Sequence, residues 1–426
     1  MSEHILLVQE AGYPWAIGGV TTWINDLLFG LPELEITVLG LRWGSDPRPA
    51  PLLPPGKRFV DVGFDWGLDV DTAVERSLNA IRSLRPSVVH ASSSGIAGWV
   101  AAAAAREMDI PLVVTEHGIA WMQHAPQPGQ GGDHAPQPAQ PGHGGDHGPE
   151  PAQPGRGAEQ APQPAQPGHD GGGRPHGPGG GGGHPSMLWW TPGERQRAAA
   201  IYAQADAITS VSWANARLQE CLVPAAKPIL VIPNGVEPAE ARPPAEPLVV
   251  FAGRIAPEKG VDLFIRTAAL LARAPADVRF EVRGPANEPD YAKECAALAA
   301  ELGLAHRLRF TGPLPRAAVL DGASLLVAPS RIEACPYAVL EALAAGVPVV
   351  AAPAGDVPMI LAGCGAISEA HPAALANASE RLLEERETAS RASLARARSF
   401  GKAAMLEAYR ALYKEVEGRK RRSRAA

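Results

Sequence analysis

Short apolar runs alternate with amphipathic segments in the first part of the chain. Four runs predict buried strands: HILLVQE (4–10), EITVLGL (35–41), SVVHASS (87–93) and PLVVTEHG (111–118). Helices are expected in between, in TTWINDLLFGL with a threonine cap, at 71–84 and at 95–107. The prolines of segment 48–60 predict a loop. Strands that alternate with helices indicate a parallel, doubly wound sheet.

The same alternation returns in the second half. Residues 187–212 predict a helix running into the strand AITSVS, and ILVIPNGV (229–236) predicts a strand with an Asn-Gly turn. After a proline-rich hinge, five more strands are expected: PLVVFAG, VRFEVRG, LRFTG, SLLVAPS and PVVAAP. The helices expected around them are 262–274, 289–303, 314–320, 336–345, 356–361, 372–398 and 400–416. This α/β pattern predicts two Rossmann-like domains facing each other across a cleft.

The alternation stops between residues 124 and 185. This segment consists of Pro, Gly, Gln, Ala and His in thirteen-residue near-repeats, so it cannot bury enough apolar surface to offset the entropy of ordering. We expect a disordered insertion, and the irregular spacing of its histidines argues against a metal site. The expected parts of the chain are a first domain (1–123 and 186–240), the insertion (124–185), a second domain (247–399), a crossover helix (400–416) and a basic tail (417–426).

Composition narrows the class of protein. The formal net charge of −6 argues against nucleic-acid binding, and four scattered cysteines without CxxC spacing argue against disulfides and zinc. The N-terminus lacks a basic region before its apolar run, and no run is long enough to span a membrane. We expect a cytoplasmic protein. Its basic tail is a solvated end or a contact with the inner face of the membrane.

Two cations follow the first strand of the second domain. Arg254 and Lys259 come after Gly253, in a loop that leads into a helix N-terminus. A guanidinium and an ammonium in this position can neutralise a diphosphate. The loop taken alone could equally be a solvated surface turn, and the carboxylates further along the chain favour the phosphate site.

Glu333 and Glu341 form the acidic counterpart. Glu333 lies in a loop after a strand, and Glu341 lies in a helix that begins near Pro336. Eight residues are about two turns if the whole segment is helical, so both carboxylates would point the same way. They could hydrogen-bond a ribose and a sugar, act as a general acid and base, or be a helix cap and an exposed glutamate.

The first domain contributes weaker candidates. Gly18 and Gly19 stand between the first strand and its helix, where they open space for a phosphate or signify a tight turn. His117 and His90 end neighbouring strands and could contact a sugar hydroxyl, or serve as structural histidines. Residues 69–71 spell D-x-D, a metal–diphosphate motif elsewhere, but Asp71 is explained as a helix cap and no metal site is expected.

These residues resemble a known family, the retaining GT-B glycosyltransferases of the large family 4 type. The resemblance rests on the glycine loop at 18–19, His117, VIPNGV (231–236), FAGRIAPEKGVDLFI (251–265), the E-x7-E segment before AAGVPVV, and FGKAAMLEAYRALYKEV (400–416). Within the family, VQEAGYPWAIGGVTTWINDLLFGLPE, TEHGI and RGPANEPDYAKECAALAAELGLAHRLRFTG are most similar to PelF-like exopolysaccharide transferases. The resemblance also implies that the helix at 400–416 packs back on the first domain.

The resemblance implies a role for each matching position. Arg254 and Lys259 bind the donor diphosphate and Glu341 the ribose. Glu333 binds the donor sugar, helped by the backbone that follows it. His117 contacts the sugar near the reacting carbon. Donor contacts also fall on the residues Gly18, Gly19, Ala334, Cys335 and Leu340. Pro336 stands where many members have an amide, so one hydrogen bond to the sugar is absent.

The implied activity is metal-independent transfer of a hexosyl unit with retention. The donor is a nucleotide sugar, expected to be a UDP-sugar, and no further cofactor is implied. The acceptor is a hydroxyl of a glycan, a lipid-linked sugar or a small molecule, within a membrane-associated polysaccharide synthesis complex, and no nucleic acid is involved. Two alternatives stay open: a nucleotide-sugar epimerase or glycogen-synthase-like enzyme of the same fold, and an inactive nucleotide-sugar-binding scaffold.

Overall fold

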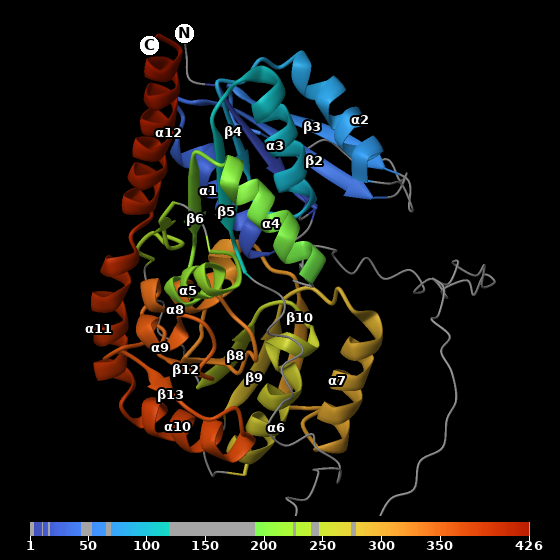
Figure 1. Ribbon diagram of the computed structural model, residues 1–426. Helices are drawn as coiled ribbons and strands as arrows, with labels where there is room; N and C mark the ends of the chain where they lie inside the picture. The colour runs from blue at the N-terminus through green and yellow to red at the C-terminus, as the bar shows by residue number, and fades with distance from the viewer. Residues whose placement is uncertain are drawn as a thin grey trace, which may run out of the picture. The chain divides into compact units, whose positions relative to one another are not determined.

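The computed structural model describes most of the chain outside the repeats (Figure 1). The described residues are 4–10, 12–15, 18–43, 53–64, 70–118, 192–224, 227–239, 247–273 and 278–425. All of them belong to one compact unit of the chain. The predicted disordered insertion, Asp69 of the D-x-D sequence and most of the proline-rich hinge lie outside the described residues.

The first sheet has seven parallel strands in the order β3-β2-β1-β4-β5-β6-β7. The strands are β1 (His4–Gln9), β2 (Glu35–Trp43), β3 (Lys57–Phe64), β4 (Val88–Ala91), β5 (Leu112–Glu116), β6 (Ala207–Ser210) and β7 (Ile229–Val231). The helices are α1 (Gly19–Gly30), α2 (Val70–Arg82), α3 (Ile96–Met108), α4 (Pro192–Gln204) and α5 (Trp213–Leu222). The strand order reverses between β1 and β4, as in doubly wound folds whose ligands bind at that reversal.

The second sheet repeats this plan with six strands in the order β10-β9-β8-β11-β12-β13. The strands are β8 (Leu248–Ala252), β9 (Arg279–Arg283), β10 (Leu308–Gly312), β11 (Leu325–Ala328), β12 (Val349–Ala351) and β13 (Ala366–Ile367). The helices are η2 (Pro257–Lys259), α6 (Val261–Leu271), α7 (Pro289–Glu301), η3 (Arg316–Ala318), α8 (Tyr337–Ala344), α9 (Val357–Ile360), α10 (Pro372–Glu384) and α11 (Arg386–Ala397). The predicted α/β fold with two Rossmann-like domains is confirmed.

Strand β1 shows why both faces of these sheets are apolar. Leu6 and Val8 join one buried hydrophobic cluster, while Ile5 and Leu7 join another. Side chains alternate across a strand, so a strand covered by helices on both faces reads as a continuous apolar run. This explains why the apolar runs predicted the inner strands correctly.

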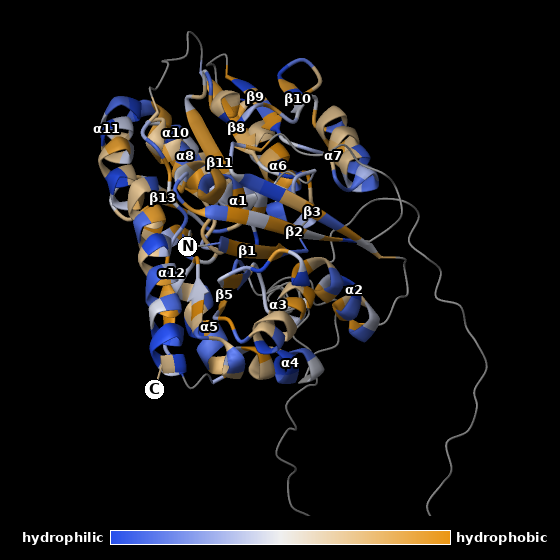
Figure 2. Cartoon of the chain, turned by 90° about the horizontal axis from the view of Figure 1, so that it is seen from above, coloured by the Kyte–Doolittle hydropathy of each residue, from blue (hydrophilic) through white to orange (hydrophobic). Residues whose placement is uncertain are grey.

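The last helix returns to the first domain, as the resemblance implied. After η4 (Arg398–Phe400), helix α12 (Lys402–Ala425) packs against α1 and β4. Figure 2 shows α12 largely hydrophilic, with isolated apolar positions. The buried ones include Tyr409 and Tyr413, whose rings lie 5.9 and 5.7 Å from the His90 ring. Helix α12 therefore completes the core of the first domain.

Several local predictions were wrong. The segment 48–60 is not all loop, because strand β3 begins at Lys57. Prolines precede this edge strand, and between its two buried ends its residues are exposed or half-buried. Helix α1 begins at Gly19 with Gly18 as its N-cap, so no threonine caps it. The expected helix at 314–320 is only the short turn η3.

The basic tail is largely exposed, and it continues the last helix, which was not predicted. Helix α12 continues to Ala425, and its charges pair along the helix. Glu417 and Arg421 are 2.8 Å apart at i,i+4 spacing, and Glu415 pairs with Arg419 in the same way. Near its end, Lys420 lies 2.6 Å from Asp109, which follows α3.

Two further elements, helix α5 and strand β13, were not predicted from the sequence.

Candidate functional site

The turn after β8 places Arg254. Its backbone crosses close to Gly284, where an added Cβ would lie 1.9 Å from the Gly253 oxygen, and Gly284 has a φ of +151°. Only glycine fits there, so the crossing fixes the turn after the strand. The Arg254 guanidinium donates to Glu258 at 2.8 Å. One of the two predicted phosphate-binding cations thus has a neighbouring carboxylate as its partner.

Lys259 and Glu333 are brought together across 74 positions of sequence. Lys259 ends η2, and its Nζ lies 2.7 Å from Glu333 Oε1. The two side chains are 22% and 12% exposed, so the pair is partly shielded from water while remaining reachable. One predicted cation and one predicted carboxylate therefore share a single location, as a phosphate next to a sugar would require.

The loop that carries Glu333 is held from several sides. Gly355 has a φ of +52°, and a Cβ there would lie 2.2 Å from the backbone carbonyl oxygen of Glu333. Only glycine allows this approach. The Asp356 amide donates to the Ala334 oxygen at 3.0 Å, and Asn234 Nδ2 donates to the Cys335 oxygen at 2.7 Å. The loop's backbone is thus fixed by residues from both domains.

Glu341 has a different partner from the other candidates. Its Oε1 accepts from Arg316 Nε at 2.5 Å, and no ion pair joins it to Arg254 or Lys259 in the described part of the chain. Helix α8 begins only at Tyr337, so Glu333 and Glu341 do not share one continuous helix. Burial raises the pKa of Glu341, and the nearby Arg316 opposes that shift.

The glycine loop of the first domain lies next to helix α8. A Cβ on Gly19 would lie 3.8 Å from the Tyr337 ring, while nothing lies within 4 Å of the corresponding point on Gly18. The start of α1 therefore faces the start of α8 with space beside it.

Two other predicted donor contacts lie in the protein interior. Leu340 is fully buried in the hydrophobic core. Burial raises the pKa of the Cys335 thiol to about 12.

His117 is held in an aromatic environment. Its ring lies 4.6 Å from the Trp23 ring, and its buried Nε2 has no hydrogen-bond partner among the described residues. Burial lowers its pKa to about 3, so the ring is neutral near pH 7. A neutral imidazole with one free nitrogen can exchange a hydrogen bond with a hydroxyl.

His90, the second candidate histidine, is a structural residue. It is fully buried, and its Nδ1 lies 2.8 Å from the Tyr413 hydroxyl while its Nε2 lies 2.7 Å from the Thr115 hydroxyl. Both ring nitrogens are therefore occupied by the protein. Of the two alternatives left open for His90, these contacts favour the structural one, because a strand end alone does not show whether a side chain faces inward.

Several polar residues of this region were missed. Asp26 on α1 is 4% exposed, and its place among apolar neighbours in WINDLL was a usable signal of a buried charge. Asp356 accepts from the amides of Trp213 and Ala214 at the start of α5, both at 2.9 Å. Nothing in its local sequence indicates that distant partner.

Two further carboxylates are buried where the first-domain strands end. Glu116 Oε1 accepts from the Ser94 amide at 2.9 Å and from the Tyr202 hydroxyl at 3.0 Å. Glu10 accepts from the Ser93 hydroxyl at 2.6 Å. Burial raises the pKa of Glu10 and raises that of Glu116 to about 7.

This burial predicts a loss of stability as the pH rises from about 4.5 to about 7. Glu116 holds its proton more tightly in the folded protein than in the unfolded chain, where its pKa is 4.5. Its contribution is therefore complete below that value and is lost as the pH rises through about 7. We expect the melting temperature of Glu116→Gln to fall less than that of the wild type between about pH 5 and 7.5. Glu301→Gln, on an exposed position, should follow the wild type, and parallel pH profiles for all three would contradict the prediction.

Two family models match separate parts of the chain. Residues 17–137 match Glycosyltransferase Family 4, and residues 246–385 match Glycosyl transferases group 1. The chain carries GT-B glycosyltransferase domains. The second match covers the loop and helix segments that hold Arg254, Lys259, Glu333 and Glu341.

Relatives of these glycosyltransferase domains match over part of their length. The chain is 35% identical over 190 residues to D-inositol 3-phosphate glycosyltransferase 1 from Catenulispora acidiphila, covering 40% of this chain and 45% of that protein. It is 33% identical over 221 residues to the D-inositol 3-phosphate glycosyltransferase of Acidothermus cellulolyticus, covering 45% and 49%. The chain thus spans less than half the length of these curated relatives.

Solved glycosyltransferase structures share the fold at low identity. Sucrose-phosphate synthase from Thermosynechococcus elongatus has a TM-score of 0.72 at 16% identity, covering 97% of this chain and 99% of that one. Anabaena Alr3699/HepE in complex with UDP and glucose has a TM-score of 0.68 at 17% identity, covering 97% of this chain and 100% of that one.

In the part of our chain that the structure describes, none of the helices is long and apolar enough to cross a bilayer.

Proposed function

We propose that this protein is a retaining glycosyltransferase that moves a hexosyl unit from a nucleotide sugar to a hydroxyl acceptor. The observation that carries the proposal is the Lys259–Glu333 pair at 2.7 Å, within a glycosyltransferase group 1 domain. A cation and a hydrogen-bonding carboxylate in contact suit a phosphate linked to a sugar. The intact charged residues argue against an inactive scaffold.

In the proposed reaction, the bond between the anomeric carbon and the diphosphate oxygen breaks. A bond from the acceptor oxygen to that carbon forms on the same face, and the acceptor proton passes to the leaving diphosphate. Arg254 and Lys259 offset the charge that grows on this leaving group, and Glu333 orients the sugar. We propose that these cations let the transfer proceed without a metal ion. We propose that His117, whose Nε2 has no hydrogen-bond partner among the described residues, contacts the sugar near the reacting carbon.

The donor is proposed to be a UDP-sugar, with Glu341 binding the ribose and Gly18 and Gly19 lining the diphosphate. The complex of the related fold with UDP and glucose supports this choice of nucleotide. A role in PelF-like exopolysaccharide synthesis at the inner face of the membrane is one proposed context. The D-inositol 3-phosphate glycosyltransferases among the relatives make a phosphorylated polyol a second acceptor class to test.

Binding of the donor nucleotide should stabilise the fold. We expect UDP, or else GDP or ADP, to raise the melting temperature, because a ligand at a hundred times its dissociation constant adds about 2.7 kcal/mol to the free energy of unfolding. The measurement is a thermal shift of the full chain with each nucleoside diphosphate, and inorganic phosphate serves as the control. The absence of a shift with all three nucleotides would contradict the proposed donor class.

Product analysis separates the alternatives. UDP-glucose and UDP-N-acetylglucosamine are incubated with and without acceptors, and the anomeric configuration of any product is read by NMR. An α-linked product from an α-linked donor supports retaining transfer. An isomerised nucleotide sugar in the absence of acceptor would favour an epimerase, and tight binding without turnover would favour a scaffold.

A further inference from the structure

A buried carboxylate on α1 connects the first domain to the helix that carries Glu341. Asp26 Oδ1 lies 2.9 Å from Arg316 Nη1 and 3.2 Å from Lys402 Nζ. Its Oδ2 accepts from the Tyr337 hydroxyl at 3.1 Å. These partners come from η3, α12 and α8. Burying a carboxylic side chain to 4% exposure costs free energy unless it has such hydrogen-bonding partners.

Arg316 bridges two carboxylates from different domains. While Nη1 binds Asp26, its Nε donates to Glu341 Oε1 at 2.5 Å, and its guanidinium carbon lies 5.2 Å from the centre of the Tyr337 ring. A planar guanidinium can hold two acceptors in a fixed relative orientation, which an ammonium cannot do. Arg316 therefore restricts the direction of the Glu341 carboxylate.

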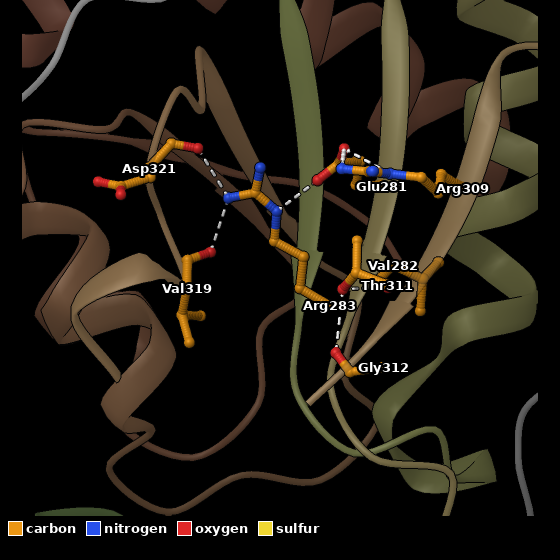
Figure 3. Close-up of polar contacts among 8 residues, drawn as sticks. All are labelled: Glu281, Val282, Arg283, Arg309, Thr311, Gly312, Val319 and Asp321. Carbon is orange, nitrogen blue, oxygen red and sulfur yellow. Dashed lines mark hydrogen bonds and ion pairs between the residues drawn. The ribbon is translucent and has the colours of Figure 1, made fainter. Parts of the chain in front are cut away.

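The segment that carries Arg316 is itself anchored. Figure 3 shows the Arg283 guanidinium of β9 between Glu281 and the segment after η3. Arg283 Nη1 donates to the carbonyl oxygens of Val319 and Asp321, both at 2.9 Å, and Nε donates to Glu281 at 2.7 Å. Because the Arg283 side chain is only 6% exposed, these bonds hold the segment in a fixed place.

One oxygen of Glu341 is left for a ligand. Arg316 occupies Oε1, whereas Oε2 has no hydrogen-bond partner among the described residues. The Glu341 side chain is 20% exposed, so a hydroxyl can reach it. Without Arg316, burial would favour the neutral acid, which accepts hydrogen bonds less strongly than a carboxylate.

We propose that Arg316 positions the Glu341 carboxylate for the ribose hydroxyls of the donor, and that Asp26 holds Arg316 in place. This inference rests on the proposed function, in which Glu341 binds the ribose. It adds that a residue of the first domain sets the affinity of the second domain for its nucleotide. Arg316 is thus a positioning residue that acts through Glu341.

The test compares ribose with deoxyribose. Dissociation constants of UDP, GDP and ADP are measured with the full chain, and the nucleotide that binds best is then compared with its 2′-deoxy and 3′-deoxy forms. The wild type should prefer the ribose form by about tenfold or more, because a hydrogen bond to a charged group is lost in the deoxy forms. In Arg316→Gln the preference should fall below about threefold, with the deoxy forms bound almost as before.

Two variants and a control complete the design. Asp26→Asn should reduce the ribose preference in the same direction but by less. Arg316→Lys keeps the charge but loses the bridge, so it should also reduce the preference, and it replaces Arg316→Gln if that variant does not fold. Arg82→Gln is the matched control, because Arg82 also bridges two carboxylates, Glu75 and Glu107, and is 44% exposed compared with 40% for Arg316. Its ribose preference should equal that of the wild type.

The outcomes are distinguishable. A wild-type ribose preference that persists in folded Arg316 variants overturns the inference and leaves the proposed function standing. A wild type that binds a nucleotide but does not prefer ribose also overturns the inference. A wild type that binds none of the three nucleotides overturns the proposed function itself.

Discussion

Lys259→Met is expected to lower kcat/KM for the nucleotide-sugar donor about 100- to 1,000-fold. The ammonium group is proposed to stabilise the charge that develops on the leaving diphosphate, and removing one such donor typically raises the barrier by about 2.7–4 kcal/mol. Methionine keeps the length and apolar stem of the side chain, so the loss reports mainly on the charge. Steady-state kinetics with the donor identified by nucleotide binding gives the value.

The control for this variant is Lys293→Met. Lys293 is 77% exposed and lies 2.9 Å from Asp290, so it also forms an ion pair, and the proposed reaction gives it no role. Its kinetics should stay within about twofold of the wild type. Because Lys259 and Glu333 are in contact, the effects of Lys259→Met and Glu333→Gln should not add in the double variant. Unchanged turnover in Lys259→Met would remove Lys259 from the catalytic site.

Tyr409→Ala is expected to reduce the free energy of unfolding by about 3–5 kcal/mol, the usual cost of deleting a large buried ring. The Tyr409 side chain is fully buried, and its ring lies 5.6 Å from that of Trp23 and 6.3 Å from that of Tyr413. Its removal leaves a cavity between α12 and the first domain. Urea unfolding followed by circular dichroism measures the change in midpoint and slope.

Two controls separate packing from general damage to the helix. Tyr409→Phe keeps the ring and should lose far less stability than Tyr409→Ala. Lys414→Ala alters an exposed position of the same helix and should stay within about 0.5 kcal/mol of the wild type. An unfolding midpoint for Tyr409→Ala equal to that of Lys414→Ala would show that α12 is not part of the first-domain core.

The candidate site could be predicted in part because it uses local motifs. Strands such as HILLVQE and glycine turns such as FAGR are encoded in neighbouring residues, so the loop with Arg254 and Lys259 was identifiable. Strand β3 was not predicted, because only one of its faces is apolar and prolines precede it. The helical continuation into the tail was not predicted, because a run of basic residues gives no apolar period that would indicate a helix.

Partner choice could not be predicted in the same way. Sequence reasoning grouped Glu333 with Glu341 by their spacing, yet one pairs with Lys259 and the other with Arg316. Asp26 and Arg316 are 290 positions apart, and nothing near either residue indicates the other. His90 and His117 look alike at their strand ends, but only His117 keeps a buried ring nitrogen without a partner among the described residues.

The sequence by itself determined the two parallel sheets, because apolar runs with period and length suited to buried strands act locally. It also determined where glycines and charges stand relative to the strand ends. The tertiary structure alone decided which carboxylate meets which cation, and which histidine keeps a ring nitrogen without a partner in the part of the chain that the structure describes. Such pairs form only when packing brings distant elements together, and the low polarity of the packed interior then makes each unpaired charge costly.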